Sequence, residues 1–331
     1  MHALKCLAGI AAAGFLAIAS LAGPAMAQAD YPSKPITVIV PFAAGGPSDT
    51  VARIFSDHMS RTLGQQMIIE NVVGAGGTVG TIRSARAAPD GYTIILGHLG
   101  THVSAVGLYP SLAYNPVTDF EPIGLTAGMP VAVLAKKDFP AKDLKEFVAY
   151  LKANEAKINQ AHAGIASVSH TTCLMFNSVI GIKPIAIPYQ GTGPSMNALV
   201  GGQVDYMCDQ VLNASPQVNA GTIKAYVVAS VERNAAIPDV PTSKEVGLSA
   251  FQMSAWNGFF APKNTPKPVV DKLNAALVKA LEDPGVQKRL SDLGSELPPP
   301  PQRSAQFLGE HVKAEIARWT PILKAAGAVV N

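Results

Sequence analysis

Hydrophobic and polar residues follow two recurring patterns along the chain. Short apolar runs such as Ile36 to Phe42 have the composition of strands that are buried on both faces of a sheet. Segments such as Val51 to Leu63 place apolar residues at helical spacing and end at a glycine, Gly64. Ser48 precedes the first of these segments and predicts a helix N-cap there. The basic unit is therefore a strand, a glycine turn and a helix.

This unit recurs over most of the sequence. A first series predicts strands at 36–42, 67–73 and 92–97, with helices between them. A second series predicts strands at 131–135, 158–163, 184–189, 204–208 and 223–229. After a further apolar run, the pattern is helical over 268–281, 285–293 and 304–326. Alternating strands and helices predict an α/β fold with two doubly wound lobes, each a mostly parallel sheet flanked by helices.

Two interruptions of the periodicity predict where the chain passes between the lobes. They fall near 127–131 and near 240–256, where Pro, Gly and Ser accumulate. We therefore expect residues 28–128 and 250–331 to form a first, discontinuous lobe and residues 129–249 to form the second. Two crossings make a hinge, and the ligand of a hinged α/β protein lies in the cleft.

Residues 1–27 have the pattern of a signal peptide. His2 and Lys5 give a basic start, an apolar run covers 7–21, and Ala25-Met26-Ala27 is a small-x-small cleavage pattern. The apolar run is shorter than the roughly 20 residues that a membrane span needs. We expect the mature chain to begin near Gln28 and to reach the periplasm.

Charge and cysteine content narrow the function classes. The mature chain has 25 basic and 23 acidic residues once Lys5 is removed, a net charge of +2, and it lacks Lys/Arg runs. This balance does not predict binding to nucleic acid or to a membrane surface. No Cys/His spacing predicts a metal site, and no cofactor motif is present. Cys173 and Cys208 form either a disulfide or two buried thiols.

Two loops are candidate anion sites, Phe42 to Asp49 and Gly164 to His170. Each follows a predicted strand and precedes a predicted helix, so unpaired backbone N–H groups and the positive end of a helix dipole point into the cleft. When the lobes close, the two loops can replace the water around a carboxylate. As alternatives, Gly45 and Gly46 form only a tight turn, and Ser169 only caps its helix.

A third glycine-rich stretch, Gly74 to Gly80, does not fit a nucleotide motif. The dinucleotide pattern requires glycine at the position of Val79, and no Gly-Lys-Ser/Thr follows. We expect this turn to pack against its neighbouring strand.

Segments along nearly the whole mature chain resemble the solute-binding proteins of tripartite tricarboxylate transporters, the Bug receptors. The matching segments are 31–36, 41–49, 74–77, 89–93, 167–170, 188–191, 201–205, 238–242 and 261–266. The resemblance implies a two-lobed Venus-flytrap fold, a small carboxylate held by the two loops, and delivery to a two-component membrane permease. We expect the receptor to be a monomer without catalytic residues.

The resemblance also implies a set of ligand-binding residues. On the first lobe these are Phe42, Ala43, Ala44, Gly45, Gly46, Ser48 and Asp49, and on the second they are Gly164, Ser167, Ser169 and His170, with Asp209 at the cleft edge. Ile165 replaces a hydroxyl residue that many relatives carry. A carboxylate at Asp49 repels an anion unless it accepts a hydrogen bond from the ligand, and the alternative is that it caps a helix.

Two other functions use the same residues. A secreted hydrolase could use Ser169 or Ser167 with His170 and Asp209, but neighbouring Ser and His side chains diverge on a helix, and no Gly-x-Ser-x-Gly elbow is present. A ligand-sensing module for a signalling partner would use the same cleft as a transport receptor, and the sequence does not separate the two.

Overall fold

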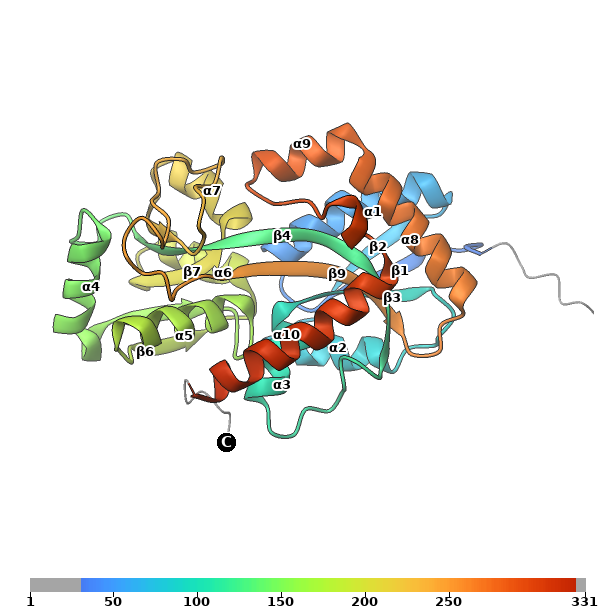
Figure 1. The fold of residues 1–331 in the computed structure, drawn as a ribbon, viewed down its shortest axis with the longest axis horizontal. Helices are drawn as coiled ribbons and strands as arrows, with labels where there is room; N and C mark the ends of the chain where they lie inside the picture. The colour runs from blue at the N-terminus through green and yellow to red at the C-terminus, as the bar shows by residue number, and fades with distance from the viewer. Residues whose placement is uncertain (1–30, 326–331) are drawn as a thin grey trace, which may run out of the picture.

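Nine strands lie within the described part of the chain, residues 31–325 of the computed structural model (Figure 1). The predicted signal peptide lies outside the described residues. The strands are β1 (Ile36–Val40), β2 (Met67–Asn71), β3 (Thr93–His98), β4 (Phe120–Lys136), β5 (Asn159–His162), β6 (Ile185–Pro188), β7 (Tyr206–Gln210), β8 (Ile223–Val228) and β9 (Ser254–Pro262).

The strands pair in the order β2-β1-β3-β9-β4-β7-β5-β6, and β8 also pairs with β4. Ladders among β1, β2 and β3 are parallel, as are those among β5, β6 and β7. The ladders that involve β4 or β9 are antiparallel. The predicted two-lobed α/β fold is confirmed, and each half of the sheet combines parallel ladders with antiparallel ones.

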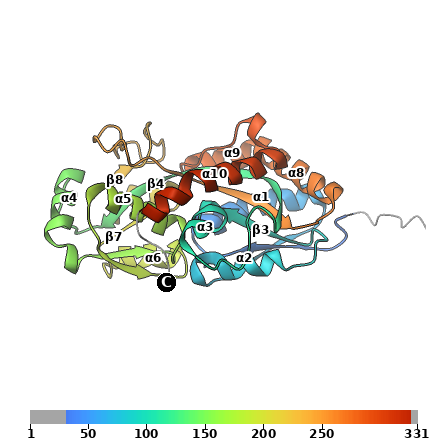
Figure 2. The same ribbon diagram turned by 60° about the horizontal axis from the view of Figure 1, so that its bottom comes forward.

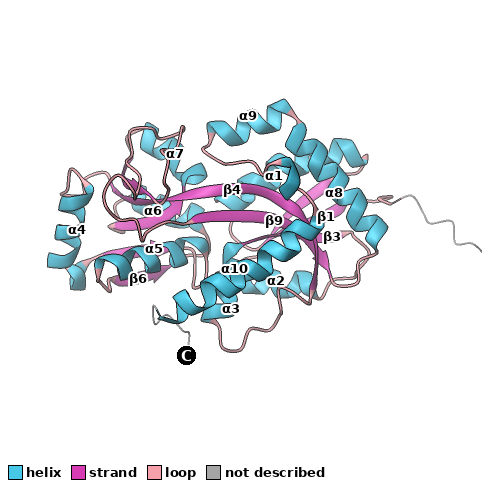
Figure 3. Cartoon of the chain, viewed as in Figure 1, coloured by secondary structure: helices cyan, strands magenta, loops and turns pink. Residues whose placement is uncertain are grey.

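Strand β4 runs through both lobes. Its residues Phe120–Pro130 pair with β9, and its residues Val131–Lys136 pair with β7 and β8. Figure 3 shows β4 and β9 side by side along the long axis of the molecule, where they connect the two groups of helices. The backbone N–H of Met253, just before β9, donates a hydrogen bond of 3.0 Å to the carbonyl oxygen of Ala229, just after β8. This bond holds the start of β9 beside the end of β8.

Helices cover both faces of the sheet (Figure 2). The α-helices are α1 (Pro47–Leu63), α2 (Thr78–Ala85), α3 (Ala105–Leu108), α4 (Leu144–Ala153), α5 (Val168–Ile180), α6 (Thr192–Val200), α7 (Val211–Asn219), α8 (Lys267–Glu282), α9 (Pro284–Asp292) and α10 (Ala305–Ala325). Short 3-10 turns occupy Ala75–Gly77, Glu155–Lys157 and Pro300–Gln302, and a π-turn occupies Gly100–Ser104. None of the described helices combines the length and the hydropathy that a membrane crossing requires.

The long C-terminal helix covers the core, as its amphipathic pattern predicts. Leu308, Val312, Trp319 and Leu323 of α10 are buried, and the helix packs on β4 and α3. These apolar residues recur at helical spacing, so they lie on one face of the helix. Packing that face against the sheet removes apolar surface from water and stabilises the fold.

Two local features differ from the sequence prediction. Helix α1 has Gly46 as its N-cap, so the N-cap predicted at Ser48 is wrong, because Pro47 has a backbone suited to the first helical position. Strand β4 begins at Phe120 instead of Val131. Its first half contains Pro122, Gly124 and Pro130, which favour a loop in isolation but here accompany shifts of register against β9.

Candidate ligand-binding site

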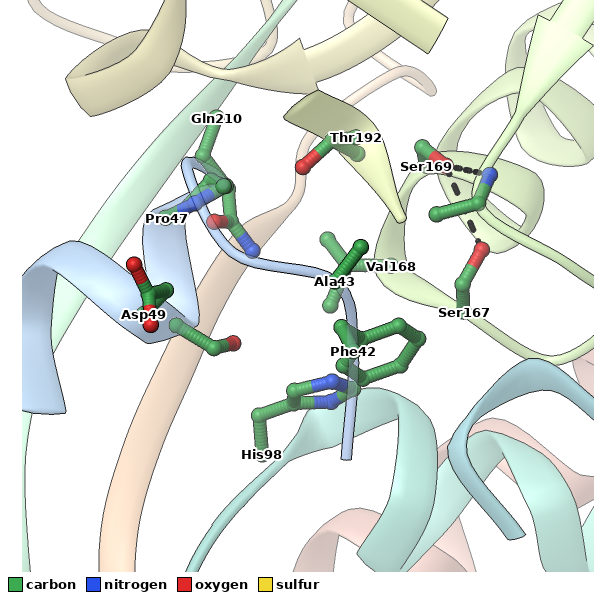
Figure 4. A pocket seen from close by; sticks show the side chains of 13 residues that line it. Phe42, Ala43, Pro47, Asp49, His98, Ser167, Val168, Ser169, Thr192 and Gln210 are labelled. Atoms are coloured by element: carbon green, nitrogen blue, oxygen red, sulfur yellow. Dashed lines mark hydrogen bonds between the residues drawn. The ribbon is translucent and has the colours of Figure 1, made fainter. Parts of the chain in front are cut away.

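A small cavity of about 20 Å³ lies between the lobes, where four helices begin (Figure 4). The first-lobe side is lined by Phe42, Ala43, Gly46, Pro47, Ser48, Asp49 and His98, and the second-lobe side by Ala163, Ser167, Val168, Ser169, Thr192 and Gln210. These residues include the N-terminal ends of α1, α5, α6 and α7. The two loops singled out in the sequence therefore share one cavity.

Backbone contacts hold the lobes together around this cavity. The N–H of Ala43 in the first lobe donates to the carbonyl oxygen of Gln190 in the second, at 3.0 Å. A Cβ atom added at Gly46 would lie 3.0 Å from Oγ1 of Thr192, and one added at Gly193 would lie 2.9 Å from the carbonyl oxygen of Ala44. Glycine at these positions permits the close approach of the two backbones.

The hydrogen-bond donors that line the cavity carry no charge. Its lining contains no Lys or Arg side chain. Positive potential comes instead from the helix N-termini, whose first N–H groups have no partner within the helix. Ser48 adds a hydroxyl donor, because its oxygen already accepts a hydrogen bond from Nδ2 of Asn257 at 3.2 Å. Such a site suits an anion whose charge is spread over two oxygens.

Ser167 and Ser169 make different hydrogen bonds at the start of α5. Ser167 caps α5, and its Oγ accepts from the N–H of His170 at 3.2 Å. Ser169 accepts from the N–H of Ala163 at 2.8 Å, and the two hydroxyl oxygens lie 3.2 Å apart. The alternative that Ser169 only caps its helix does not hold, because Ser167 is the N-cap and the helix begins one residue before Ser169. One hydroxyl can donate to the other, which leaves one hydroxyl hydrogen for the cavity.

Asp49 is engaged by groups of its own lobe. Its carboxylate accepts two hydrogen bonds of 2.9 Å from Arg53, one of 3.0 Å from Asn71 and one of 3.1 Å from the N–H of Gly45. Burial alone would raise the pKa of Asp49, but the bonds from Arg53, Gly45 and Asn71 outweigh it and hold the pKa below its usual value. Asp49 is thus ionised and neutralised by Arg53 at the edge of the site.

Five residues in the expected site do not line this cavity. Gly164 lines a larger, adjoining cavity of about 380 Å³ that shares Phe42 and Ala163 with the first. The ring of His170 packs on His162 at 4.7 Å and lines a separate pocket beside α5 and β6. The other three residues outside the cavity are Ala44, Gly45 and Asp209.

Asp209 belongs to a buried network instead of the cavity surface. It is 1% exposed, and it accepts from the N–H of Gln210 at 2.8 Å and from Nδ2 of Asn213 at 2.5 Å. Burial raises the pKa of Asp209 to about 7, against the lowering effect of these two bonds. Its neighbour Gln210 lines the cavity, because successive residues of a strand point to opposite faces.

Three polar residues that line the cavity were not predicted from the sequence: His98, Thr192 and Gln210. His98 ends β3, and Gln210 follows Cys208 by two residues on the same face of β7. Thr192 is the first residue of α6. The position of each at the carboxyl end of a strand or the start of a helix was the available signal.

The glycine-rich stretch 74–80 makes contacts in two directions. Gly80 packs against Pro41 and Val72 of its own lobe, as expected for a turn beside a strand. Gly76 instead meets the backbone of Ile165 in the second lobe, so part of this loop belongs to the lobe interface. Tyr109 adds to the interface, because its hydroxyl lies within hydrogen-bond distance of the carbonyl oxygens of Ala75 (3.1 Å) and Ile165 (3.3 Å).

A disulfide joins Cys173 of α5 to Cys208 of β7, with a Cα separation of 5.3 Å. It connects the helix whose N-terminus lines the cavity to the strand that carries Gln210.

The serine side chains are not arranged for nucleophilic catalysis. Within residues 31–325, Ser167 and Ser169 bond to each other and to backbone N–H groups, and neither has a hydrogen bond to a histidine ring. Nδ1 of His170 is directed at the N–H of Ala166, at 3.4 Å. The same residues contain no group of three side chains placed to hold a metal ion.

Comparison with known proteins places the chain in a family. The tripartite tricarboxylate transporter family receptor model matches residues 51–328. A UPF0065 protein of Agrobacterium vitis is 42% identical over 303 residues, which cover 92% of this chain and 87% of that protein. Among solved structures, MatC from Rhodopseudomonas palustris with bound malate is 52% identical with a TM-score of 0.87, covering 88% of this chain and all of MatC.

The periplasmic binding protein BugD is 45% identical with a TM-score of 0.88, and the match covers 90% of this chain and 99% of BugD. The chain belongs to the Bug family of tripartite tricarboxylate transporter receptors.

Proposed function

We propose that this chain is a periplasmic receptor that closes its two lobes around a small carboxylate and delivers it to a two-component membrane permease. One observation carries the proposal: helix N-termini from opposite lobes line one cavity that contains no cationic side chain. Its membership in a family of transporter receptors supports the same function.

Unpaired backbone N–H groups supply the recognition in this proposal. Ser48 and Asp49 lie in the first turn of α1, and Val168 and Ser169 lie in the first turn of α5. Pro47 contributes no N–H, so the α1 donors are those of the next two residues. A carboxylate between the two turns exchanges its water for fixed donors, which offsets the cost of burying its charge.

The ligand extends beyond the small cavity. A volume of about 20 Å³ holds little more than one water molecule, so the lobes must separate for a carboxylic acid to enter. The adjoining cavity of about 380 Å³ beyond Phe42 offers room for the remainder of the molecule. Relatives support a dicarboxylate of variable length, since MatC was solved with malate and a second R. palustris protein, 29% identical, with adipate.

The proposal includes the predicted division of the chain. Residues 28–128 and 250–331 form the first lobe, and residues 129–249 form the second. The change of partner along β4 at Pro130 and Val131, from β9 to β7 and β8, supports a boundary at this point. We further propose that residues 1–27 are removed on export, and that the mature receptor is a monomer without catalytic activity.

A thermal-shift screen of the mature protein tests this function. A ligand at a hundred times its dissociation constant stabilises the folded state by about 2.7 kcal/mol. We expect dicarboxylates to raise the unfolding temperature, and neutral sugars and amines of similar size to leave it unchanged. If no carboxylic acid stabilises the protein while a neutral solute does, the carboxylate assignment is wrong.

A further inference from the structure

His98 forms a wall of the cavity and has a fixed orientation. It lies at the end of β3, is 2% exposed, and stacks on Phe42 with ring centroids 5.0 Å apart (Figure 4). Its Nδ1 accepts hydrogen bonds from the backbone N–H groups of Gly100 (2.8 Å) and Thr101 (3.3 Å). Nδ1 therefore carries no hydrogen.

The remaining ring nitrogen is a donor. Burial lowers the pKa of His98 to about 4, so the ring is neutral near pH 7 and its single hydrogen lies on Nε2. Among residues 31–325, Nε2 of His98 has no hydrogen-bond acceptor. Nε2 of His98 is not among the fully buried atoms without a hydrogen-bond partner, whereas Nε2 of His102 is. Since His98 lines the cavity, this N–H is available there.

The structure prevents His98 from becoming an acceptor at Nε2. That change would move the hydrogen to Nδ1, where it would face the N–H groups of Gly100 and Thr101 and break both hydrogen bonds. The cavity thus contains one donor that cannot reverse its polarity.

Because the cavity is small, only the part of a ligand next to the bound carboxylate can reach the Nε2 hydrogen of His98. The N-termini of α1 and α5 and the ring of His98 line the same space of about 20 Å³. We infer that a carboxylate held by those helices in the proposed complex brings its neighbouring carbon toward His98, because all three line the same space. The distal part of the acid extends past Phe42 into the larger cavity.

We propose that His98 contacts the ligand and selects acids with a hydroxyl or oxo oxygen on the carbon next to the bound carboxylate over acids with an ammonium group there. An oxygen accepts the Nε2 hydrogen, whereas an ammonium group has only donors to offer. This inference rests on the proposed function and names the ligand class of the same site.

Calorimetry with three acids of one skeleton tests the selectivity of the wild-type protein. Malate carries the hydroxyl, aspartate carries the ammonium group, and succinate carries neither. We expect malate to bind at least about tenfold more tightly than aspartate and more tightly than succinate, because one hydrogen bond is formed only with malate. Aspartate binding as tightly as malate would overturn the inference.

The variant His98→Asn separates the two sides of the ring. The Asn carbonyl oxygen can still accept from Gly100 and Thr101, but the donor at the Nε2 position is lost. We expect malate to bind about tenfold more weakly to this variant, and succinate to bind as it does to the wild type. His102→Asn is the control, because His102 is equally buried but does not line the cavity, and its preference for malate should remain.

The outcomes distinguish the inference from the function on which it rests. If no carboxylic acid binds the wild-type protein, both fail. If acids bind but His98→Asn keeps the wild-type ratio of malate to aspartate affinity, only the role of His98 fails. If the variant does not fold, nitrogen NMR of the wild-type histidines decides: hydrogen on Nε2, with a shift on malate binding that succinate does not produce, supports the inference. Hydrogen on Nδ1 overturns it.

Discussion

Gly76 of the first lobe and Ile165 of the second meet backbone to backbone across the cleft, so closely that a Cβ atom at Gly76 would overlap the carbonyl oxygen of Ile165. From the opposite side, a Cβ at Gly164 would lie 2.8 Å from Cα of Gly76. Under the proposed function, this contact forms when the lobes close. Gly76 therefore controls how far they can approach.

Gly76→Ala should hold the lobes apart and weaken dicarboxylate binding at least tenfold. The added methyl group opposes only the closed form, so the equilibrium shifts toward the open one. Calorimetry measures the affinity, and small-angle scattering with saturating ligand should show a larger radius of gyration than in the wild type.

Gly64→Ala is the matched control for this variant. Gly64 has a φ of 71° and Gly76 a φ of 64°, so both substitutions cost roughly 1 kcal/mol of backbone strain. No atom lies within 4 Å of a Cβ at Gly64. Equal affinities of the two variants would show that the contact with Ile165 does not limit closure.

The two serines of α5 should respond differently to alanine. Ser169→Ala should weaken carboxylate binding by roughly 1 to 3 kcal/mol. Ser167→Ala removes the N-cap and should lower the free energy of unfolding by about 1 kcal/mol. Circular dichroism checks the fold of Ser169→Ala, because Ala163 loses an acceptor in that variant. Unchanged affinity of a folded Ser169→Ala protein removes that residue from the site.

Arg53 should matter for binding although it does not line the cavity. Arg53→Ala leaves the carboxylate of Asp49 beside the site without its counter-charge, and we expect anion affinity to fall by about 1 kcal/mol. A second substitution, Asp49→Asn, should restore the affinity. If Asp49→Asn alone abolishes binding, Asp49 contacts the ligand directly.

Asp209 should make stability depend on pH. Its pKa rises from 3.8 to about 7 on folding, so the folded state holds this proton more tightly than the unfolded state does. The stabilisation is fully present below pH about 4 and is lost as the pH rises through about 7. Chemical denaturation between pH 4 and 8 should show this decline. It should be smaller in Asp209→Asn, and an equal decline in both proteins would assign the effect to other groups.

Removing the disulfide should cost stability without removing the ligand site. Cys173 and Cys208 are separated by 35 positions, and a loop of this size predicts a loss of roughly 2 to 4 kcal/mol in a protein with both residues replaced by serine. Denaturant titration measures the loss. Thiol titration of the unfolded, unreduced wild type should find neither cysteine free, and two reactive thiols would contradict the bridge.

Much of the fold follows from local patterns in the sequence. The run 36–42 and the helical spacing of 51–63 each identified an element whose structure agrees closely, because buried strands and amphipathic helices impose different periods on their side chains. The first half of β4 escaped prediction because its prolines and glycines oppose a strand locally. Pairing with β9, more than a hundred residues away, stabilises it.

The candidate site was predictable where backbone chemistry defines it. Loops before α1 and α5 follow from the strand-turn-helix pattern, and both line the cavity. Single side chains were harder to predict. His98 is one of several histidines, and nothing beside it in the sequence indicates that its ring faces the cavity. Asp209 and Gln210 differ by one position, and only the register of β7 decides which of them points inward.

Strand β4 forms backbone hydrogen bonds with strands of both lobes. Expressing either lobe alone would leave backbone N–H and C=O groups of its strands without partners, so neither lobe is expected to fold independently. The lobe closure that the proposed function requires is therefore expected to come from twisting and bending of continuous strands, which would act as an elastic joint. Such a joint returns to a preferred angle, in contrast to a flexible tether. Melting of the receptor should accordingly be one cooperative event, and captured cargo should protect the entire polypeptide from proteases.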